Sequence, residues 1–431
     1  MHAIVSGSGL IIDGWATNTP DVAFARGHYY SDKAPGTLAL AVPGFITGCA
    51  YLQVTHEILE SNNGWLITSW TACGGIAILV AYGLLTMSLL LEQFTQSIVG
   101  WFTASAIWFG AAPLPYSTLL FSHAHVVACI AIALFALCQI RPELFGFSHR
   151  VIILNEKSKW LMLAGFAFGW ALNSEYTSAI VIVCSCVAIL GCNWRDYFWI
   201  GLGLAVPLSL VPLYSWFTVG SPFVLPYSYQ ASFPEMKKGL YAIGMPSAIV
   251  AYNLTFGSAR GLFFWSPFLL CALLGYSRML KTFPRLFWLT YATPLLHIVV
   301  ISGRVWDWPA GATLGPRYLA PILPLLAFPC AFGLQRFPKI GMVFVIYSIL
   351  ITTLATLTDA CPNFGFHPNP LFDLHIPLFL KGEFSPNLGM VLGLPPFASV
   401  ALFYAILIGY FWYGWRTFSK EHPENVATKA Q

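Results

Sequence analysis

Residues 117–140 read STLLFSHAHVVACIAIALFALCQI and contain no aspartate, glutamate, lysine or arginine. A helix of roughly 20 apolar residues crosses the ~30 Å hydrocarbon layer of a bilayer. Apolar runs of similar length recur along the rest of the chain. The sequence therefore predicts a protein that crosses a membrane several times.

The composition excludes a water-soluble fold. Of the 431 residues, 57% are hydrophobic and only 9% are charged, and the mean hydropathy is +0.70. Soluble domains carry about 25% charged residues. No segment shows the alternation over about 10 residues that is typical of a membrane barrel strand. We therefore expect an all-α polytopic membrane protein.

The apolar runs predict about eleven transmembrane helices. They cover residues 65–91, 98–114, 117–140, 159–174, 177–191, 197–218, 262–277, 286–302, 318–334, 340–358 and 396–415. The loops between them alternate in charge: one set holds 13 lysines and arginines against 6 acids, and the other set holds 8 against 11. The positive-inside rule assigns the basic set to the cytoplasm.

The short apolar segment 37–55 contains Pro43, Gly44 and Gly48. We interpret it as an interfacial or re-entrant helix, with an ordinary spanning helix as the alternative. This interpretation makes residues 1–64 an external loop and residues 65–415 the transmembrane bundle. The bundle then carries external loops 219–261, 303–317 and 359–395, and residues 416–431 form a cytoplasmic tail. Because no signal peptide follows Met1, we also expect the start to be truncated, with one further spanning helix in relatives.

The external head contains Tyr29-Tyr30-Ser31-Asp32-Lys33-Ala34-Pro35-Gly36. Pro35 is suited to begin a helix, so the Lys33 ammonium should lie near the amides of a helix N-terminus. These groups together can bind a phosphate. Asp32 or Asp21 could be the general base for a hydroxyl, and His28 and Tyr30 are further candidate binding residues. The alternative for each charge alone is a solvated loop position.

A second candidate cluster occupies residues 303–318, with Trp308, Arg317 and Tyr318 as the candidate binding residues. Arginine binds phosphate or carboxylate with two parallel hydrogen bonds, and tryptophan faces suit sugar rings. Arg317 also lies at the edge of a predicted span, where snorkelling alone would explain it. Arg260 could join the same anion site. Glu175 is a candidate because acids at membrane depth are often functional, although it could merely cap the following helix.

The cysteines predict neither a disulfide framework nor a metal site. Most of the ten lie inside apolar runs, where cysteine behaves as a small hydrophobic residue. His123 and His125 are two apart on a predicted helix and point to different faces, so they are not expected to share a metal.

With these residues in view, the chain resembles the membrane-integral glycosyltransferases of the GT-C type. These include the protein O-mannosyltransferases and the lipid A aminoarabinose transferase. The resemblance rests on Gly27 to Gly36, Pro115-Tyr116-Ser117-Thr118 with His123, Glu175-Tyr176, Gly257 to Phe264 with Ser266-Pro267, Trp308 to Tyr318, and Asn387-Leu388-Gly389. It implies a GT-C-like fold, a catalytic acid on the first external loop, and a sugar donor linked to a polyprenyl or dolichyl phosphate.

The resemblance also matches Lys33, before Ala34-Pro35, to a lysine that faces the lipid phosphate in the aminoarabinose transferase. The usual acidic motif of the family lies just after its first span, upstream of this chain. Asp21 and Asp32 are therefore proposed in its place.

The leading interpretation is an inverting glycosyltransferase in the cell inner membrane, with its active site on the external (periplasmic) face. Its expected partners are a lipid-linked sugar donor and membrane lipids, with no nucleic acid and an acceptor that the sequence does not identify. No cofactor is required, although a divalent cation could assist the base. The alternatives are a transporter or flippase of lipid-linked sugars, which typically carries internal repeats, and an inactive truncated relative.

Overall fold

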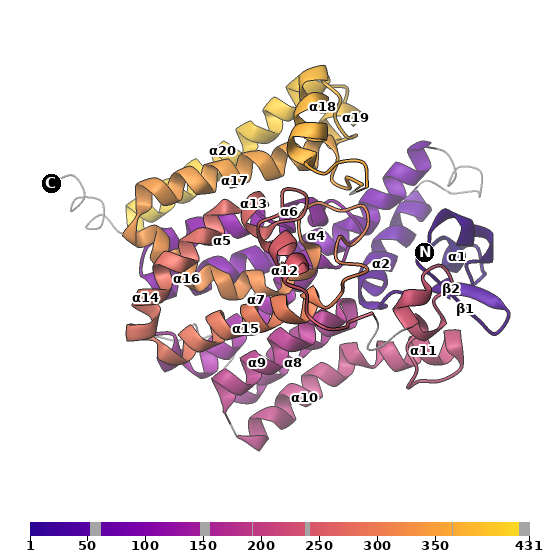
Figure 1. Cartoon of the computed structure of the whole chain (residues 1–431), viewed down its shortest axis with the longest axis horizontal. Helices are drawn as coiled ribbons and strands as arrows, with labels where there is room; N and C mark the ends of the chain where they lie inside the picture. Colours follow the sequence, from indigo (N-terminus) through magenta and orange to yellow (C-terminus); the bar gives the residue numbers. More distant parts are fainter. Residues whose placement is uncertain (52–61, 147–155, 192, 238–241, 364, 422–431) are drawn as a thin grey trace.

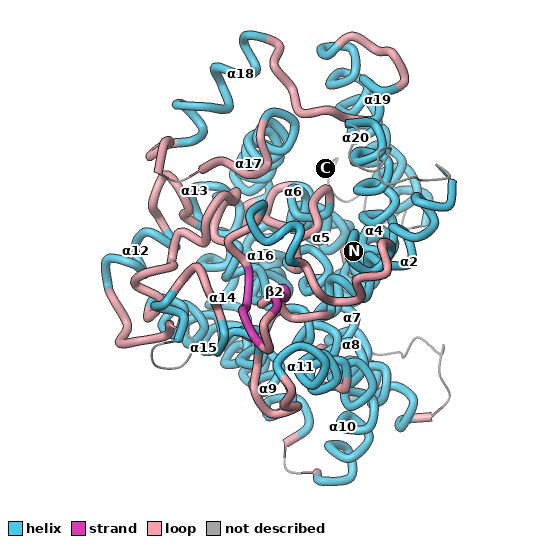
Figure 2. Tube along the Cα trace, turned by 90° about the vertical axis from the view of Figure 1, so that its right-hand side faces the viewer, coloured by secondary structure: helices cyan, strands magenta, loops and turns pink. Residues whose placement is uncertain are grey.

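The computed structural model describes residues 1–51, 62–146, 156–191, 193–237, 242–363 and 365–421. Most of the long helices run between two ends of the molecule, with the N-terminal head at one end and the C-terminus at the other (Figure 1). Seen from the head end, the strands and most of the loops lie over the middle of the helical bundle (Figure 2). The functional candidates of the sequence belong to strand β2 (His28–Ser31), to the short helix Arg317–Ile322 or to the loops beside them.

The head contains the two strands that the structure describes. Helix α1 (His2–Val5) and the short helix η1 (Asp13–Asn18) precede strands β1 (Val22–Ala25) and β2 (His28–Ser31), which pair antiparallel. The turn between the strands is Arg26-Gly27, and both residues have positive φ, 53° and 84°. Such two-residue turns match the twist of a hairpin, and glycine adopts the positive φ without strain.

Helix α2 (Gly36–Tyr51) begins directly after Pro35, as the sequence predicts. It then continues through Pro43, and the two following glycines do not interrupt it. A side chain at Gly44 or Gly48 would clash with Thr71 of helix α4 (Asn62–Thr95). The predicted helix is therefore confirmed from Gly36 to Tyr51, and the glycines allow the close helix contact typical of membrane proteins. Residues 52–55 of the predicted segment lie outside the described residues.

The first half of the bundle consists of α4 and the helices that follow it in the sequence. These are α5 (Ile98–Phe109), α6 (Pro113–Ser117), α7 (His123–Ile140), α8 (Lys157–Ser174), α9 (Ala179–Leu190), α10 (Trp194–Leu208) and α11 (Leu210–Val219). Helix α7 is the most enclosed of them, because 94% of its apolar window is buried inside the protein. Many side chains of α10 and α11 are exposed instead. The apolar residues of these two helices therefore suit contact with lipid.

The second half contains α12 (Ala248–Thr255), α13 (Leu262–Trp265), α14 (Cys271–Thr282), α15 (Pro284–Ser302), α16 (Leu323–Arg336), α17 (Pro338–Thr358), α18 (Ile376–Lys381), α19 (Leu388–Val391) and α20 (Pro396–Glu421). Helix α16 is as enclosed as α7. Helices α14 and α16 approach each other through Gly275 and Gly333, where an added side chain would clash with the backbone of the opposite helix. The centre of the bundle therefore depends on small residues at helix contacts.

Within the described residues, seven helical segments are long and apolar enough to cross a membrane. The protein is therefore a mostly helical chain with several candidate spans, and the number eleven stays a prediction. Helix α5 has only 12 residues, about 18 Å at 1.5 Å per residue. The predicted span 262–277 is divided among α13, a short helix at Pro267–Leu270, and α14, because Pro267 removes a backbone donor and ends the first helix.

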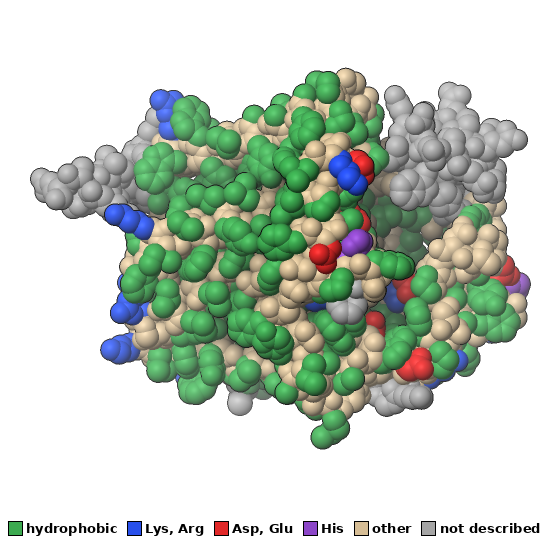
Figure 3. Space-filling model, turned by 45° about the horizontal axis from the view of Figure 1, so that its top comes forward, with side chains coloured by type: hydrophobic (Ala, Val, Ile, Leu, Met, Phe, Trp, Pro, Cys, Tyr) green, Lys and Arg blue, Asp and Glu red, His purple; other side chains and the backbone are tan. Residues whose placement is uncertain are grey.

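Charged side chains are distributed unequally over the two ends. On the face shown in Figure 3, the end opposite the head carries only lysine and arginine among its visible charged side chains, whereas the half with the head carries acidic side chains and histidines together with some lysine or arginine. The assignment of the basic loops to the cytoplasm stays a prediction.

Candidate functional site

A cavity of about 650 Å³ opens at the head end of the bundle. Its walls come from the head, the start of α2, the segment before α7, the end of α8, residues 227–236 and the loop 303–317. It contains both polar and apolar lining, including Leu38 and Ala41 of α2 together with Leu120 and Phe121. The two candidate clusters of the sequence, almost 300 residues apart, therefore face one cavity.

One side of the cavity is an ion cluster around Lys33. The Lys33 Nζ lies 3.0 Å from Asp21 Oδ1 and 3.3 Å from Asp32 Oδ1, and 5.4 Å from the centre of the Tyr227 ring. The side chains of Lys33 and Asp21 are 42% and 45% exposed, whereas that of Asp32 is fully buried. Asp21 is therefore the carboxylate that a ligand can reach, and Asp32 lies behind the lysine.

The hairpin explains why the two carboxylates meet. Val22 pairs with Ser31 in the ladder, so Asp21 and Asp32 occupy the next opposed positions, and the Asp32 N–H donates to the Asp21 carbonyl at 3.4 Å. Gln230 holds the start of the hairpin by donating from Nε2 to the Pro20 carbonyl at 2.8 Å. Two like charges at opposed positions repel, and Lys33 compensates for this.

Burial and charge act in opposite directions on this cluster. Burial raises the pKa of Asp32, although Lys33 partly offsets this effect. Burial opposes the charge of Lys33, but Tyr227, Asp32 and Asp21 outweigh it and raise the pKa of the lysine. Lys33 is therefore a permanent cation at neutral pH, and its charge is already balanced by two carboxylates.

The opposite side of the cavity is formed by loop 303–317 and the residue after it. Arg304 Nη2 donates to Asp307 Oδ2 at 2.5 Å, and the Tyr318 hydroxyl donates to the same oxygen at 2.7 Å. The Arg317 guanidinium lies 5.3 Å from the Phe121 ring centre and 5.2 Å from that of Tyr318. Within the described residues Arg317 forms no ion pair, and its Nε has no hydrogen-bond partner. Arg317 is thus a cation held between two rings without a carboxylate.

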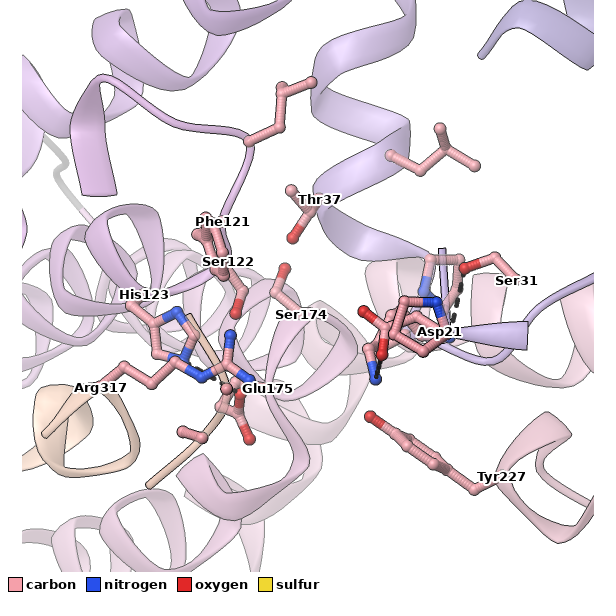
Figure 4. A pocket seen from close by; sticks show the side chains of 18 of the residues that line it. Asp21, Ser31, Thr37, Phe121, Ser122, His123, Ser174, Glu175, Tyr227 and Arg317 are labelled. Carbon is pink, nitrogen blue, oxygen red and sulfur yellow. Dashed lines mark hydrogen bonds and ion pairs between the residues drawn. The ribbon is translucent and has the colours of Figure 1, made fainter. Parts of the chain in front are cut away.

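Between the two sides, Glu175 and His123 face each other (Figure 4). His123 Nε2 lies 3.6 Å from Glu175 Oε2, and Thr177 donates to the other carboxylate oxygen at 2.9 Å. Glu175 begins the short helix after α8 and its side chain is 16% exposed. Its side chain makes no capping bond to the backbone of that helix, and it lines the cavity.

Besides the buried Asp32, four candidates from the sequence lie outside the cavity. His28 is paired with Asp13 on the exposed part of the hairpin, with Nδ1 2.7 Å from Asp13 Oδ2. This histidine also lowers the pKa of Asp13. Tyr30 is buried against Val219, and Trp308 packs on the main core. The cavity contains Trp306 instead of Trp308.

Arg260 is the fourth, and its expected place in the anion site is wrong. Its side chain is only 1% exposed. Its guanidinium donates to the carbonyls of Pro309 and Gly311 at 2.9 Å and of Pro362 at 3.2 Å. Burial lowers the pKa of Arg260 to about 10. Arg260 therefore joins two loops and shapes the cavity wall from behind.

Several lining residues were not identified as site residues from the sequence. They are Thr37, Ser122, His123, Ser174, Tyr227, Arg304, Trp306 and Asp307. Arg304, Trp306 and Asp307 belong to a stretch that the sequence singled out for its arginines and tryptophans. The others are single polar residues in loops and helix ends, and no local pattern distinguishes them.

In the part of the chain that the structure describes, no group of three histidine, cysteine, aspartate or glutamate side chains could hold a metal ion. The carboxylates of Asp21 and Asp32 already contact Lys33, so the residues present do not fit a divalent cation at this position.

Comparisons with known proteins give no relative. No protein-family model, no curated protein and no solved structure matches the chain. The residues of the site are therefore the only indication of function.

Proposed function

We propose that this protein transfers a sugar from a polyprenyl-phosphate-type lipid to a hydroxyl group of an acceptor. The observation that carries the proposal is the cavity itself, which holds Arg317, with no carboxylate of the described residues within ion-pair distance, opposite the half-exposed Asp21. It lies at the end of an apolar bundle, next to apolar side chains of α2. A lipid-linked substrate needs this combination of an anion site with an apolar surface.

Arg317 is the residue proposed to bind the phosphate of the donor. The sequence favoured Lys33, but two carboxylates already neutralise that lysine. The Arg317 guanidinium lies against the rings of Phe121 and Tyr318. These contacts already restrict the side chain, so little conformational freedom is lost when the guanidinium binds an anion. In this role Arg317 stabilises the negative charge that the departing phosphate gains.

Asp21 is proposed as the general base. Its carboxylate would take the proton of the acceptor hydroxyl while the acceptor oxygen forms a bond to the anomeric carbon of the sugar. The bond from that carbon to the phosphate oxygen breaks, and its electron pair leaves with the lipid phosphate. A single displacement of this kind inverts the anomeric configuration. Lys33 and the buried Asp32 position Asp21 and have no direct part in this scheme.

The proposed location of the cavity is the external, periplasmic face of the cell inner membrane. The support is the distribution of charge, because the end opposite the head carries only lysine and arginine among its visible charged side chains on the face shown in Figure 3.

The test uses proteoliposomes that contain the protein and a polyprenyl-phosphate-linked radioactive hexose, with a membrane extract as the source of acceptor. Release of free polyprenyl phosphate and label in the acceptor fraction are both measured. Asp21→Asn should lower both by about 10²–10⁴-fold. Asp13→Asn is the matched control, because Asp13 lies on the same head outside the cavity and pairs with His28; this variant should retain full activity.

Equal rates for wild type and Asp21→Asn would remove Asp21 from the mechanism. Movement of the labelled lipid across the bilayer without release of carrier would favour a flippase instead. No release with any acceptor extract would favour an inactive relative.

A further inference from the structure

Three hydroxyl groups lie in the middle of the cavity, between Arg317 and Asp21 (Figure 4). Thr37 belongs to the first turn of α2, Ser122 directly precedes α7, and Ser174 ends α8. They come from three separate elements, so only the tertiary structure brings them together.

These hydroxyls do not make the local bonds that such positions usually allow. Ser174 is 6% exposed, and its Oγ has no hydrogen-bond partner within the described part of the chain. A hydroxyl inside a helix commonly donates to a carbonyl of the preceding turn, as Thr103 does to Val99 at 2.7 Å. Ser122 occupies the N-cap of α7 but makes no capping bond, although serine is favoured there for that bond.

Polar groups next to these hydroxyls also have few hydrogen-bond partners among the described residues. His123 is 3% exposed, and neither of its ring nitrogens has a hydrogen-bond partner among the described residues. Among the described residues, the Thr37 hydroxyl makes a single long side-chain contact, 3.4 Å to His125 Nε2. Buried polar groups without partners cost free energy. Several of them around one cavity therefore indicate a ligand that supplies both donors and acceptors.

We propose that Thr37, Ser122 and Ser174 bind the hydroxyl groups of an uncharged sugar ring. This inference rests on the proposed function and adds the orientation of the donor. The phosphate lies at Arg317, the ring lies across the three hydroxyls, and the anomeric carbon faces Asp21. Hydroxyls and a sugar ring can each donate and accept, whereas a free lipid phosphate offers nothing for these side chains to bind beyond its charged group.

The close approach of α2 and α8 agrees with the assignment of a sugar ring to this site. A side chain at Gly36 would clash with the Ser174 hydroxyl, so glycine at this position allows the start of α2 to approach the end of α8. The ring is thereby confined between these two helix ends, Ser122 and the side chain of Glu175.

The experiment measures binding to the full chain in nanodiscs with two kinds of probe. The first is polyprenyl phosphate without a sugar, and the second is the same lipid linked to glucose, mannose or galactose. The double variant Ser174→Ala with Thr37→Val should weaken binding of the best sugar-bearing probe about tenfold, because two neutral hydrogen bonds are lost. Binding of the bare phosphate should not change.

Arg317→Gln should weaken both kinds of probe, and Ser277→Ala, an exposed serine of α14 outside the cavity, should weaken neither. If the double variant binds every probe as tightly as wild type, the sugar site is refuted while the proposed function stands. If wild type binds no probe, the proposed function itself is refuted. Tighter binding of a glucosamine-linked lipid that is lost in Glu175→Gln would overturn the assignment to an uncharged sugar.

Discussion

Replacing Arg260 by methionine should loosen the cavity wall without removing any group that lines the cavity. Methionine keeps the apolar length of the side chain but has no donor, so the carbonyls of Pro309, Gly311 and Pro362 each lose a hydrogen bond. Bonds from a charged donor contribute about 1.5–3 kcal/mol each, which gives roughly 5–9 kcal/mol before compensation. Removing a buried charge recovers part of this, so we expect a loss of about 3–5 kcal/mol.

Thermal unfolding in detergent and site-specific thiol labelling measure this effect. At about 2 °C per kcal/mol for a large chain, the apparent Tm should fall by roughly 6–10 °C. Cys361 precedes Pro362 and is only partly exposed, so its labelling by maleimide should become faster. Arg195→Met is the control, because Arg195 is exposed and contacts only Trp194 among the described rings.

An Arg260→Met protein with an unchanged Tm and unchanged labelling of Cys361 would refute the role of Arg260 in stabilising the cavity wall. A decrease of the same size in the Arg195→Met control would show that loss of positive charge, and not loss of the loop contacts, is responsible.

Three further predictions concern other parts of the chain. Burial raises the pKa of Asp32, so the folded state holds this proton more tightly than the unfolded chain. Stability should therefore increase as the pH falls through the raised pKa toward 3.8, and calorimetry of Asp32→Asn should show a smaller increase. Gly275→Val should lower the Tm or prevent folding because the side chain would clash with Pro329, whereas Gly409→Ala, with nothing within 4 Å, should not. His28→Ala should leave the rate of polyprenyl phosphate release unchanged. A decrease of this rate by tenfold or more would show that His28 belongs to the site.

Much of the architecture follows from the sequence because it depends on local properties. A long apolar run is removed from water whichever segments pack around it. Residues 117–140 therefore predict most of α7 from their own composition. Pro35 likewise predicts the start of α2, because its ring fixes φ and its missing N–H is not needed there. The roles of Gly44 and Gly48 depend instead on contacts with another helix. A glycine can end a helix or allow two helices to approach, and only the position of Thr71 decides between these roles.

The same division applies to the candidate site. The sequence identified Asp21, Lys33, Glu175 and Arg317 as polar residues beside apolar runs, and all four line one cavity. It assigned Arg260 to the same group, since an arginine before a span has the same local pattern whether it faces a ligand or a carbonyl.

The sequence alone determined that the chain is helical and apolar, and which loops carry the charges, because hydrophobic burial and loop charge are sums over neighbouring residues. The tertiary structure decided which charges are compensated. Lys33 is neutralised because the hairpin register opposes Asp21 and Asp32, whereas Arg317 meets aromatic rings and no carboxylate among the described residues. Electrostatic interaction depends on distances between residues far apart in the chain, and folding alone sets those distances.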